Sequence, residues 1–137
     1  MSVCTFFGHR DTKEEVIQKL EKEIVNLIET ENVDNFLVGN QGNFDFFVAK
    51  VLKKLQVSYP NITYTVVLSY MPQKEETENS IYPEFLVKVP YRYAIAKRNE
   101  WMIEQADYVI TCVKYNVGGA YKYKSLSEKK NKIVINI

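Results

Sequence analysis

The sequence has little of what metal sites and many hydrolytic active sites need. His9 is its only histidine, and its two cysteines, Cys4 and Cys112, lie far apart inside apolar, strand-like runs. No Cys/His cluster therefore has the spacing of a zinc site, and a Ser-His-Asp type triad would have to use His9. We expect no metal, no cofactor and two buried free thiols, as in a reducing cytosol.

Long apolar runs and a strong net charge are also missing. The longest apolar stretches are about six residues, far short of the ~20 that cross a bilayer, and the first residues do not resemble a signal peptide. The formal net charge of +1 gives no global field to gather nucleic acid or an anionic membrane. These absences predict a cytoplasmic protein with no membrane partner, and they count against nucleic acid as a partner.

The composition that remains is that of a folded globular protein. The chain has 137 residues, of which 46% are hydrophobic and 26% are charged. This balance distinguishes it from a disordered chain, and the length fits one domain better than two. We therefore predict a single domain over residues 1–137.

Strand-like and helix-like segments alternate along almost the whole chain. Apolar and β-branched runs predict five strands, at 2–7, 35–39, 62–70, 108–113 and 132–137. Apolar residues at helical spacing predict helices between them, over 13–31, from 44 to about 59, over 92–106, and in the basic segment after Gly119. Thr12 and Glu15 have the spacing of a capping box at the start of the first helix. The polar segment 71–84, which has two prolines, predicts a surface loop or flap.

This alternation is typical of an α/β fold in which helices cover both faces of a parallel sheet. Right-handed crossovers favour a three-layer, doubly wound, mainly parallel sheet of five strands, for which we predict the order 3-2-1-4-5. In such sheets ligands bind beyond the carboxyl ends of the strands, where the winding direction reverses. The loops after the first, second and fourth strands are therefore the candidate site.

All three of these loops, at 8–11, 39–45 and 116–121, contain glycine. Two of them open onto a predicted helix, whose first N–H groups are unpaired and favour an anion. Gly39 and Gly42 would let a phosphate or carboxylate approach that backbone, with Asn40 and Asn43 as further donors, and Asn43 or Asp45 as helix cap. The alternative is a tight turn that needs no ligand. The segment is neither the dinucleotide fingerprint nor a Walker P-loop.

Several side chains outside the glycines are candidates for the same crevice. Arg98 falls on the apolar stripe of the third helix, so it needs either a structural carboxylate or a ligand phosphate, ribose or base. Asn99 lies beside it. His9 and Arg10 follow the first strand and either reach the crevice or serve as cap or surface residues. Tyr121 and Tyr123, which alternate with Lys122 and Lys124, either flank a base or form a solvated face.

Four segments in this order resemble the SLOG superfamily of Rossmann-like nucleotide-binding proteins, which is named for its Smf/DprA and LOG branches. They are "TFFGHR" (5–10), "GNQGNFD" (39–45), "AKRNEWMIEQAD" (96–107) and "GGAYKY" (118–123). The chain is most similar to small bacterial and phage members whose first strand ends in T-x-F-G-H-R. The resemblance covers nearly the whole chain. It implies a Rossmann-like fold and a nucleotide or nucleotide-derived ligand.

The resemblance also implies which residues hold that ligand. The G-x-x-G-x-D loop corresponds to Gly39, Gly42 and Asp45, and the G-G-[TA] turn to Gly118, Gly119 and Ala120. The predicted ligand-binding residues are Gly8, His9, Arg10, Gly39, Asn40, Gly42, Asn43, Asp45, Arg98, Asn99, Gly118, Gly119, Ala120 and Tyr121. Homo-oligomers are common in the superfamily, and the aromatic segment 82–93 can be an interface, a core strand or a lid.

One departure from the family pattern bears on catalysis. The LOG branch hydrolyses nucleoside monophosphates with the motif P-G-G-x-G-T-x-x-E, whereas "NVGGAYKYKSLSE" lacks the proline and the third glycine, and has Lys124 at the fourth position after "GGA". We therefore predict a binding module that senses or sequesters a nucleotide signal, such as an immune signal bound by a phage protein. The alternative is a nucleotide N-glycosidic hydrolase with Asp45, Glu100 or Glu84 as its carboxylate. A DNA-binding role like that of Smf/DprA is the third hypothesis.

Overall fold

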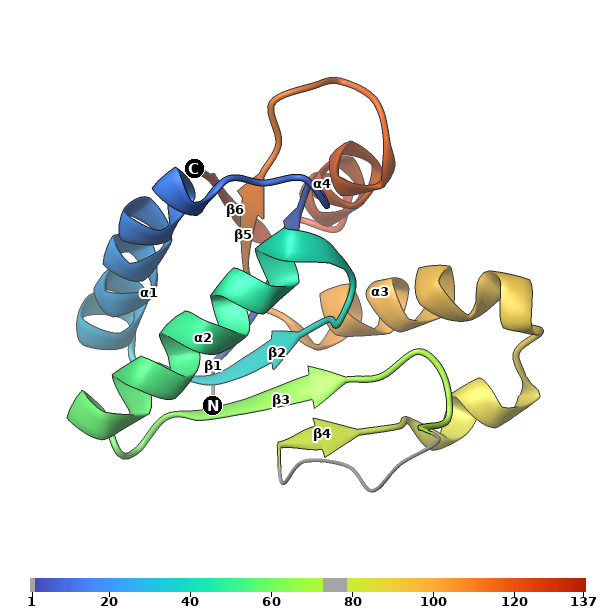
Figure 1. Cartoon of the computed structure of the whole chain (residues 1–137), viewed down its shortest axis with the longest axis horizontal. Coiled ribbons are helices and arrows are strands. Elements are labelled where there is room, and N and C mark those ends of the chain that lie inside the picture. The colour runs from blue at the N-terminus through green and yellow to red at the C-terminus, as the bar shows by residue number, and fades with distance from the viewer. Residues whose placement is uncertain (1, 73–78) are drawn as a thin grey trace.

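The computed structural model of the chain describes residues 2–72 and 79–137. Its strands are β1 (Ser2–Gly8), β2 (Val33–Val38), β3 (Thr63–Val67), β4 (Ser80–Ile81), β5 (Tyr108–Cys112) and β6 (Ile133–Asn136). Its α-helices are α1 (Ile17–Glu31), α2 (Gly42–Ser58), α3 (Ala94–Gln105) and α4 (Gly119–Lys129) (Figure 1). Short 3-10 helices span Glu14–Val16, Glu84–Lys88 and Tyr91–Tyr93.

The strands form one sheet in the order β4-β3-β2-β1-β5-β6, and every pairing among them is parallel. The five predicted strands are β1, β2, β3, β5 and β6, so the predicted order 3-2-1-4-5 is confirmed. The α/β, doubly wound architecture is confirmed as well. The strand count is not, because β4 adds a sixth strand at the edge beside β3.

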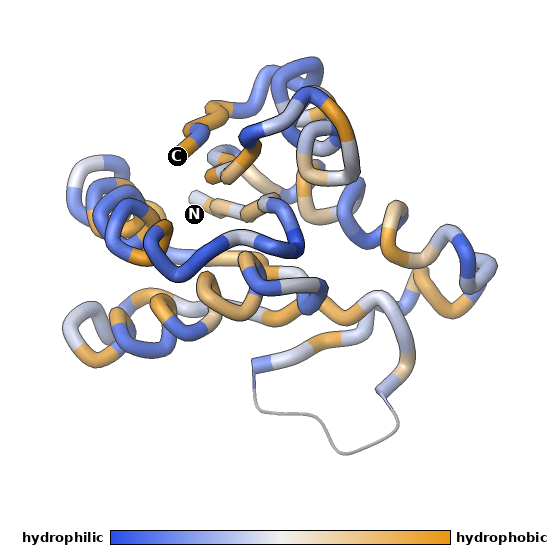
Figure 2. Tube along the Cα trace, turned by 45° about the horizontal axis from the view of Figure 1, so that its top comes forward, coloured by the Kyte–Doolittle hydropathy of each residue, from blue (hydrophilic) through white to orange (hydrophobic). Residues whose placement is uncertain are grey.

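The core is divided by the sheet into two layers of side chains. Cys4 and Phe6 of β1 belong to the cluster that contains the buried faces of α1 and α2, whereas Phe7 belongs to the cluster with α3 and α4. Successive residues of a strand point to opposite faces, so β1 supplies both layers. Figure 2 shows apolar and polar residues interleaved along the helices, as amphipathic helices require. Cys4 and Cys112 are both free and buried.

The predicted capping box at the first helix is wrong. Thr12 instead donates its hydroxyl to the carbonyl oxygen of His9 at 2.6 Å, and the chain enters α1 through the 3-10 helix Glu14–Val16 without a side-chain cap. The motif predicted a cap because the spacing of Thr12 and Glu15 fits one. The Thr12 hydroxyl forms its hydrogen bond within the turn after β1 and is therefore not available to cap the helix.

The prediction of a loop or flap over 71–84 is only partly comparable with the structure, because 73–78 lie outside the described residues. Beyond them, Ser80 and Ile81 form β4 against Val66 and Val67 of β3. A strand of two residues is too short to produce a period in the sequence, so it was not predicted. Segment 82–93 is not a core strand, because it contains two 3-10 helices, with Leu86 buried and Val87 exposed.

The loops after β1, β2 and β5 meet because β1 lies between β2 and β5. His9 donates its N–H to the carbonyl oxygen of Cys112 at 3.4 Å, and Asn43 donates its N–H to that of Arg10 at 2.9 Å. The loop after β1 is thus joined to both of the others. Within the described residues, no helix has the length and apolar character needed to cross a membrane.

Gly8 provides a test of how β1 packs on α2. A Cβ added at Gly8 would lie 2.3 Å from the ring of Phe44, which is fully buried. We expect Gly8→Ala to lower the free energy of unfolding in urea by about 1–3 kcal/mol, because the ring has no room to move. Gly119→Ala is the matched control, since nothing lies within 4 Å of its added Cβ. Equal stability of the two variants would contradict this packing.

Candidate functional site

A cavity of about 420 Å³ lies where these loops meet, at the carboxyl ends of the central strands. Four parts of the chain line it: the end of β1 with the following loop, the start of α2, the segment from Arg92 into α3, and the first turns of α4. Its walls therefore include the N-termini of three helices. This is the position that the winding rule predicts for a ligand site.

The structure brings together eight of the predicted ligand-binding residues around this cavity, namely Gly8, His9, Arg10, Asp45, Arg98, Asn99, Gly119 and Ala120. The other six do not line it, namely Gly39, Asn40, Gly42, Asn43, Gly118 and Tyr121. Seven further lining residues, Phe6, Phe7, Gln41, Arg92, Ile95, Ala96 and Met102, were not predicted, and Tyr123 takes the place expected for Tyr121. That these residues bind a ligand stays a prediction.

All the arginines of the chain line this cavity. The sequence contains three arginines, Arg10, Arg92 and Arg98, and no lysine is among the lining residues that the structure describes. Arg10 and Arg92 are exposed, whereas Arg98 is only 2% exposed. A planar guanidinium binds phosphate and carboxylate groups in a bidentate way that a lysine ammonium does not.

Arg98 is held by neutral acceptors. Its Nε donates to Asn99 Oδ1 at 3.1 Å, and its Nη1 donates to Asn40 Oδ1 at 2.7 Å and to the carbonyl oxygen of Val67 at 3.2 Å. Among the described residues, no carboxylate forms an ion pair with Arg98, and its Nη2 has no acceptor. Burial lowers the pKa of Arg98, and the charge of Asp45 opposes that change.

Asp45 is the acidic residue that lines the cavity. Its Oδ2 accepts the backbone N–H of Gln41, the residue that precedes α2, at 2.9 Å. Burial raises the pKa of Asp45 to about 6, although the Gln41 hydrogen bond and the charges of Arg98 and Arg10 oppose the shift. Gly39 brings these groups together, because a Cβ there would lie 2.7 Å from Asp45 Oδ2 and 3.2 Å from Arg98 Nη2.

Gly42 and Asn43 join the first two loops instead of facing the cavity. Gly42 has a φ of 86°, and a Cβ there would lie 2.8 Å from Arg10 Cα. The side-chain amide of Asn43 donates to the carbonyl oxygen of Thr12 at 3.4 Å. The positive φ and the close approach of the Arg10 backbone account for this glycine without a ligand.

His9 connects the cavity to the loop after β5. Its Nε2 accepts the backbone N–H of Lys114 at 3.0 Å, and its ring lies 5.2 Å from the ring of Tyr115, between centroids. A nitrogen that accepts carries no proton, so in this arrangement His9 adds no positive charge to the cavity.

The first turn of α4 forms another wall of the cavity. Gly118 caps the helix with a φ of 92°, and Gly119 and Ala120 then present N–H groups that have no acceptor within the helix. Tyr123 is buried, stacks on Phe7 at 5.3 Å between ring centroids, and gives this wall its apolar part.

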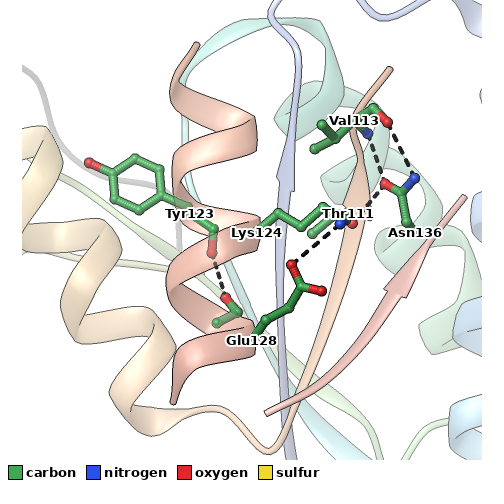
Figure 3. Close-up of polar contacts among 7 residues, drawn as sticks. Thr111, Val113, Tyr123, Lys124, Glu128 and Asn136 are labelled. Carbon is green, nitrogen blue, oxygen red and sulfur yellow. Dashed lines mark hydrogen bonds and ion pairs between the residues drawn. The ribbon is translucent and has the colours of Figure 1, made fainter. Parts of the chain in front are cut away.

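Lys124, which replaces the expected glutamate, does not line the cavity. Its Nζ pairs with Glu128 at 3.4 Å on α4 (Figure 3). Asn136 of β6 holds the chain after β5 by bonding both the N–H and the carbonyl oxygen of Val113, as the same view shows. The two other proposed carboxylates are also outside the lining: Glu100 pairs with Lys97 at 3.5 Å, and Glu84 is exposed at the start of a 3-10 helix.

The raised pKa of Asp45 predicts how stability depends on pH. Because the folded chain favours the protonated carboxyl, this contribution is fully present below the ordinary pKa of 3.8 and is lost as the pH rises through about 6. It amounts to at most about 3 kcal/mol, and less for a partly exposed group. We expect the free energy of unfolding of Asp45→Asn, measured in urea from pH 4 to 7, to fall less with rising pH than that of the unsubstituted chain. Equal slopes would show that burial does not perturb this carboxyl.

Two solved structures with a similar fold are of DNA processing proteins. The chain is similar to DNA processing protein A of Streptococcus pneumoniae, with a TM-score of 0.71 and 14% identity, over 99% of this chain and 50% of that one. It is also similar to DNA processing protein A of Helicobacter pylori, described for its binding of single-stranded DNA, with a TM-score of 0.62 and 16% identity, over 98% and 64%. The chain thus spans half to two thirds of their length, and at this identity the likeness shows the fold alone.

A search of curated proteins found no match. The sequence pattern of one family, in contrast, matches almost the entire chain, from residue 2 to residue 135. The glycine loops and the Arg-Asn pair of α3, on which the resemblance to the SLOG superfamily depends, lie within that range. The chain belongs to the YspA SLOG family.

Proposed function

We propose that this chain binds a nucleotide or nucleotide-derived signalling molecule in the 420 Å³ cavity, as a sensor or sequestering protein. The observation that carries the proposal is the gathering of all three arginines around one cavity in a chain whose net charge is only +1. With Asp45 ionised and His9 neutral, the lining residues that the structure describes have an excess of two positive charges (three arginines less one carboxylate). Such a cavity favours an anion with one or two phosphate charges.

Two groups of donors support a phosphate in particular. Arg98 is buried, and its Nη2 lacks an acceptor among the described residues, so an anion in the cavity would stabilise it. The first N–H groups of α4, at Gly119 and Ala120, add the positive end of a helix dipole. One buried arginine and one open helix terminus thus face the same space.

The remaining lining suits the less polar part of a nucleotide. Phe7, Tyr123 and Met102 provide an apolar wall, on which a flat base can pack. The cavity volume also falls in the usual range of small-molecule sites, roughly 300–1,000 Å³. Family membership supports the same ligand class, because the chain resembles the SLOG superfamily of nucleotide-binding proteins.

Single-stranded DNA is a second candidate ligand. The Helicobacter pylori protein, which has a similar fold, is described for its binding of single-stranded DNA. In this chain Arg10 and Arg92 are exposed at the cavity, and the Arg92 guanidinium lies 4.9 Å from the ring centroid of the exposed Tyr93. Exposed cations next to aromatic rings are the groups that bind single strands. The small net charge does not exclude such a local site, so nucleic acid stays a candidate partner.

The proposal extends to a cellular role and an assembly. A phage or bacterial protein of this kind would sequester an immune signalling nucleotide from its effector. A homo-oligomer would bury the exposed apolar residues Val87, Tyr91 and Tyr93 of segment 82–93. A mass of one chain by light scattering would contradict the assembly.

Mass spectrometry of small molecules released from the heat-denatured protein would identify a bound ligand class.

Exposed arginines give the direct test of anion binding. We expect Arg10→Ala and Arg92→Ala each to weaken binding of a nucleotide by about ten- to a hundredfold, because each removes a charge-assisted contact. Isothermal titration calorimetry measures the affinity. Both side chains are exposed, so melting temperatures should stay unchanged.

Lys88→Ala is the control for this test, because Lys88 is exposed and outside the lining. It removes the same charge from the chain and should leave affinity unchanged. Equal losses in Lys88→Ala and Arg92→Ala would mean that binding depends on net charge and not on this cavity.

A hydrolase needs more than this cavity provides. Cleavage of an N-glycosidic bond requires a carboxylate near the ribose and a proton donor near the base, whose help grows in the transition state. Of the proposed carboxylates only Asp45 lines the cavity, and Lys124 does not reach it. We therefore expect no release of free base from AMP or the other common nucleoside monophosphates, as followed by chromatography. Steady release that is lost in Asp45→Asn but kept in Glu100→Gln would overturn this and make the chain an enzyme.

A further inference from the structure

Two polar side chains flank Arg98 in the cavity with hydrogen-bonding capacity to spare. Asp45 uses Oδ2 to accept the Gln41 N–H, and no donor to its Oδ1 lies among the described residues. Asn99, which is 7% exposed, uses Oδ1 to accept Arg98 Nε, and within the same residues its Nδ2 has no acceptor. The cavity thus offers one free acceptor and, at Asn99 and Arg98, two free donors.

A carboxylate does not fit the rest of this anion-binding cavity. Asp45 repels a phosphate, and when ionised it can only accept hydrogen bonds. The part of an anionic ligand that lies against it must therefore carry a hydrogen-bond donor, such as a hydroxyl or an amine. Leaving its free oxygen without a donor would cost part of the affinity, because a charged acceptor that a bound ligand shields from water requires a partner.

The positions of these groups indicate which part of a nucleotide lies there. On one side, Gln41 bonds both Asp45 and, through its Oε1 at 3.3 Å, the exposed Arg10. On the other side, Asn99 lies one helical turn from Met102, which belongs to the apolar wall, and from Ile95, which also lines the cavity. The polar group therefore lies between an arginine suited to phosphate and a wall suited to a base. In a nucleotide the sugar occupies that middle position.

A ribose also matches the pattern of donors and acceptors. Each hydroxyl can donate one hydrogen bond and accept others, and the 2′ and 3′ hydroxyls are adjacent. One can donate to Asp45 Oδ1 while the other accepts from Asn99 Nδ2, which leaves Arg98 Nη2 for the phosphate. A deoxyribose has lost the 2′ hydroxyl and leaves one of these groups unpaired.

We infer that Asp45 and Asn99 hold the 2′ and 3′ hydroxyls of a ribose, so that the ligand is a ribonucleotide or a ribose-containing derivative and not DNA. This inference rests on the proposed nucleotide-binding function. It assigns Asp45 to sugar recognition and not to catalysis. It also separates this chain from a protein that binds single-stranded DNA through the same cavity.

Calorimetric titration with AMP, GMP, CMP and UMP, each paired with its 2′-deoxy counterpart, tests the inference. For whichever base binds, we expect the ribonucleotide to bind at least about tenfold more tightly, because the deoxy form leaves a buried polar group unpaired. Asp45→Asn should reduce this ratio to about threefold or less, since a neutral amide oxygen is a weaker acceptor. A merely structural role of Asp45 would weaken both sugars equally and leave the ratio unchanged.

Asp11→Asn is the matched control, because Asp11 is an exposed carboxylate outside the cavity lining, and it should change neither affinity nor ratio. Equal binding of the two sugars, or tighter binding of an oligodeoxynucleotide, would overturn the inference and leave nucleotide binding in place. Preference for guanine whatever the sugar would overturn it too, by assigning Asp45 to the base. Absence of binding by every nucleotide would overturn both the inference and the proposed function.

Discussion

The burial of one guanidinium constrains much of this structure. Arg98 lies almost fully buried at the carboxyl ends of the strands, and a buried charge must have hydrogen-bond partners. Its acceptors come from three elements: Val67 at the end of β3, Asn40 in the loop after β2, and Asn99 on α3. A single side chain thus fixes α3 against two strand ends. The floor of the cavity is built around it, and Gly39 is needed where Asp45 approaches.

The same constraint accounts for the charge pattern of the cavity. Because the acceptors of Arg98 are neutral, its charge is not cancelled by contact, and Asp45 acts on it only from beyond ion-pair distance. The exposed Arg10 and Arg92 add to that charge instead of balancing it. Fifteen of the eighteen cationic residues are lysines, and none of those that the structure describes lines the cavity. A chain with almost no net charge therefore concentrates its arginines in one place.

Much of the fold could be predicted from local patterns, because those patterns have a physical period. Apolar runs identified five strands, and the connection rules then predicted their order and the edge at which a ligand would bind. Helical spacing placed Arg98 on the inward face of α3, where the structure has it. β4 and the 3-10 helices at 84–93 were missed, since two to five residues do not establish a period.

The sequence by itself determined the layers, the strand order and the buried arginine, because periodicity and chirality act over neighbouring residues. Only the tertiary structure decided which side chains face the cavity. It turned Tyr123 inward and left Tyr121 outside, and it used Gly42 and Asn43 to join two loops. It also brought in Arg92, which the sequence had not indicated as a ligand-binding residue. These choices depend on how loops distant in the sequence pack on one another, and no local signal encodes that packing.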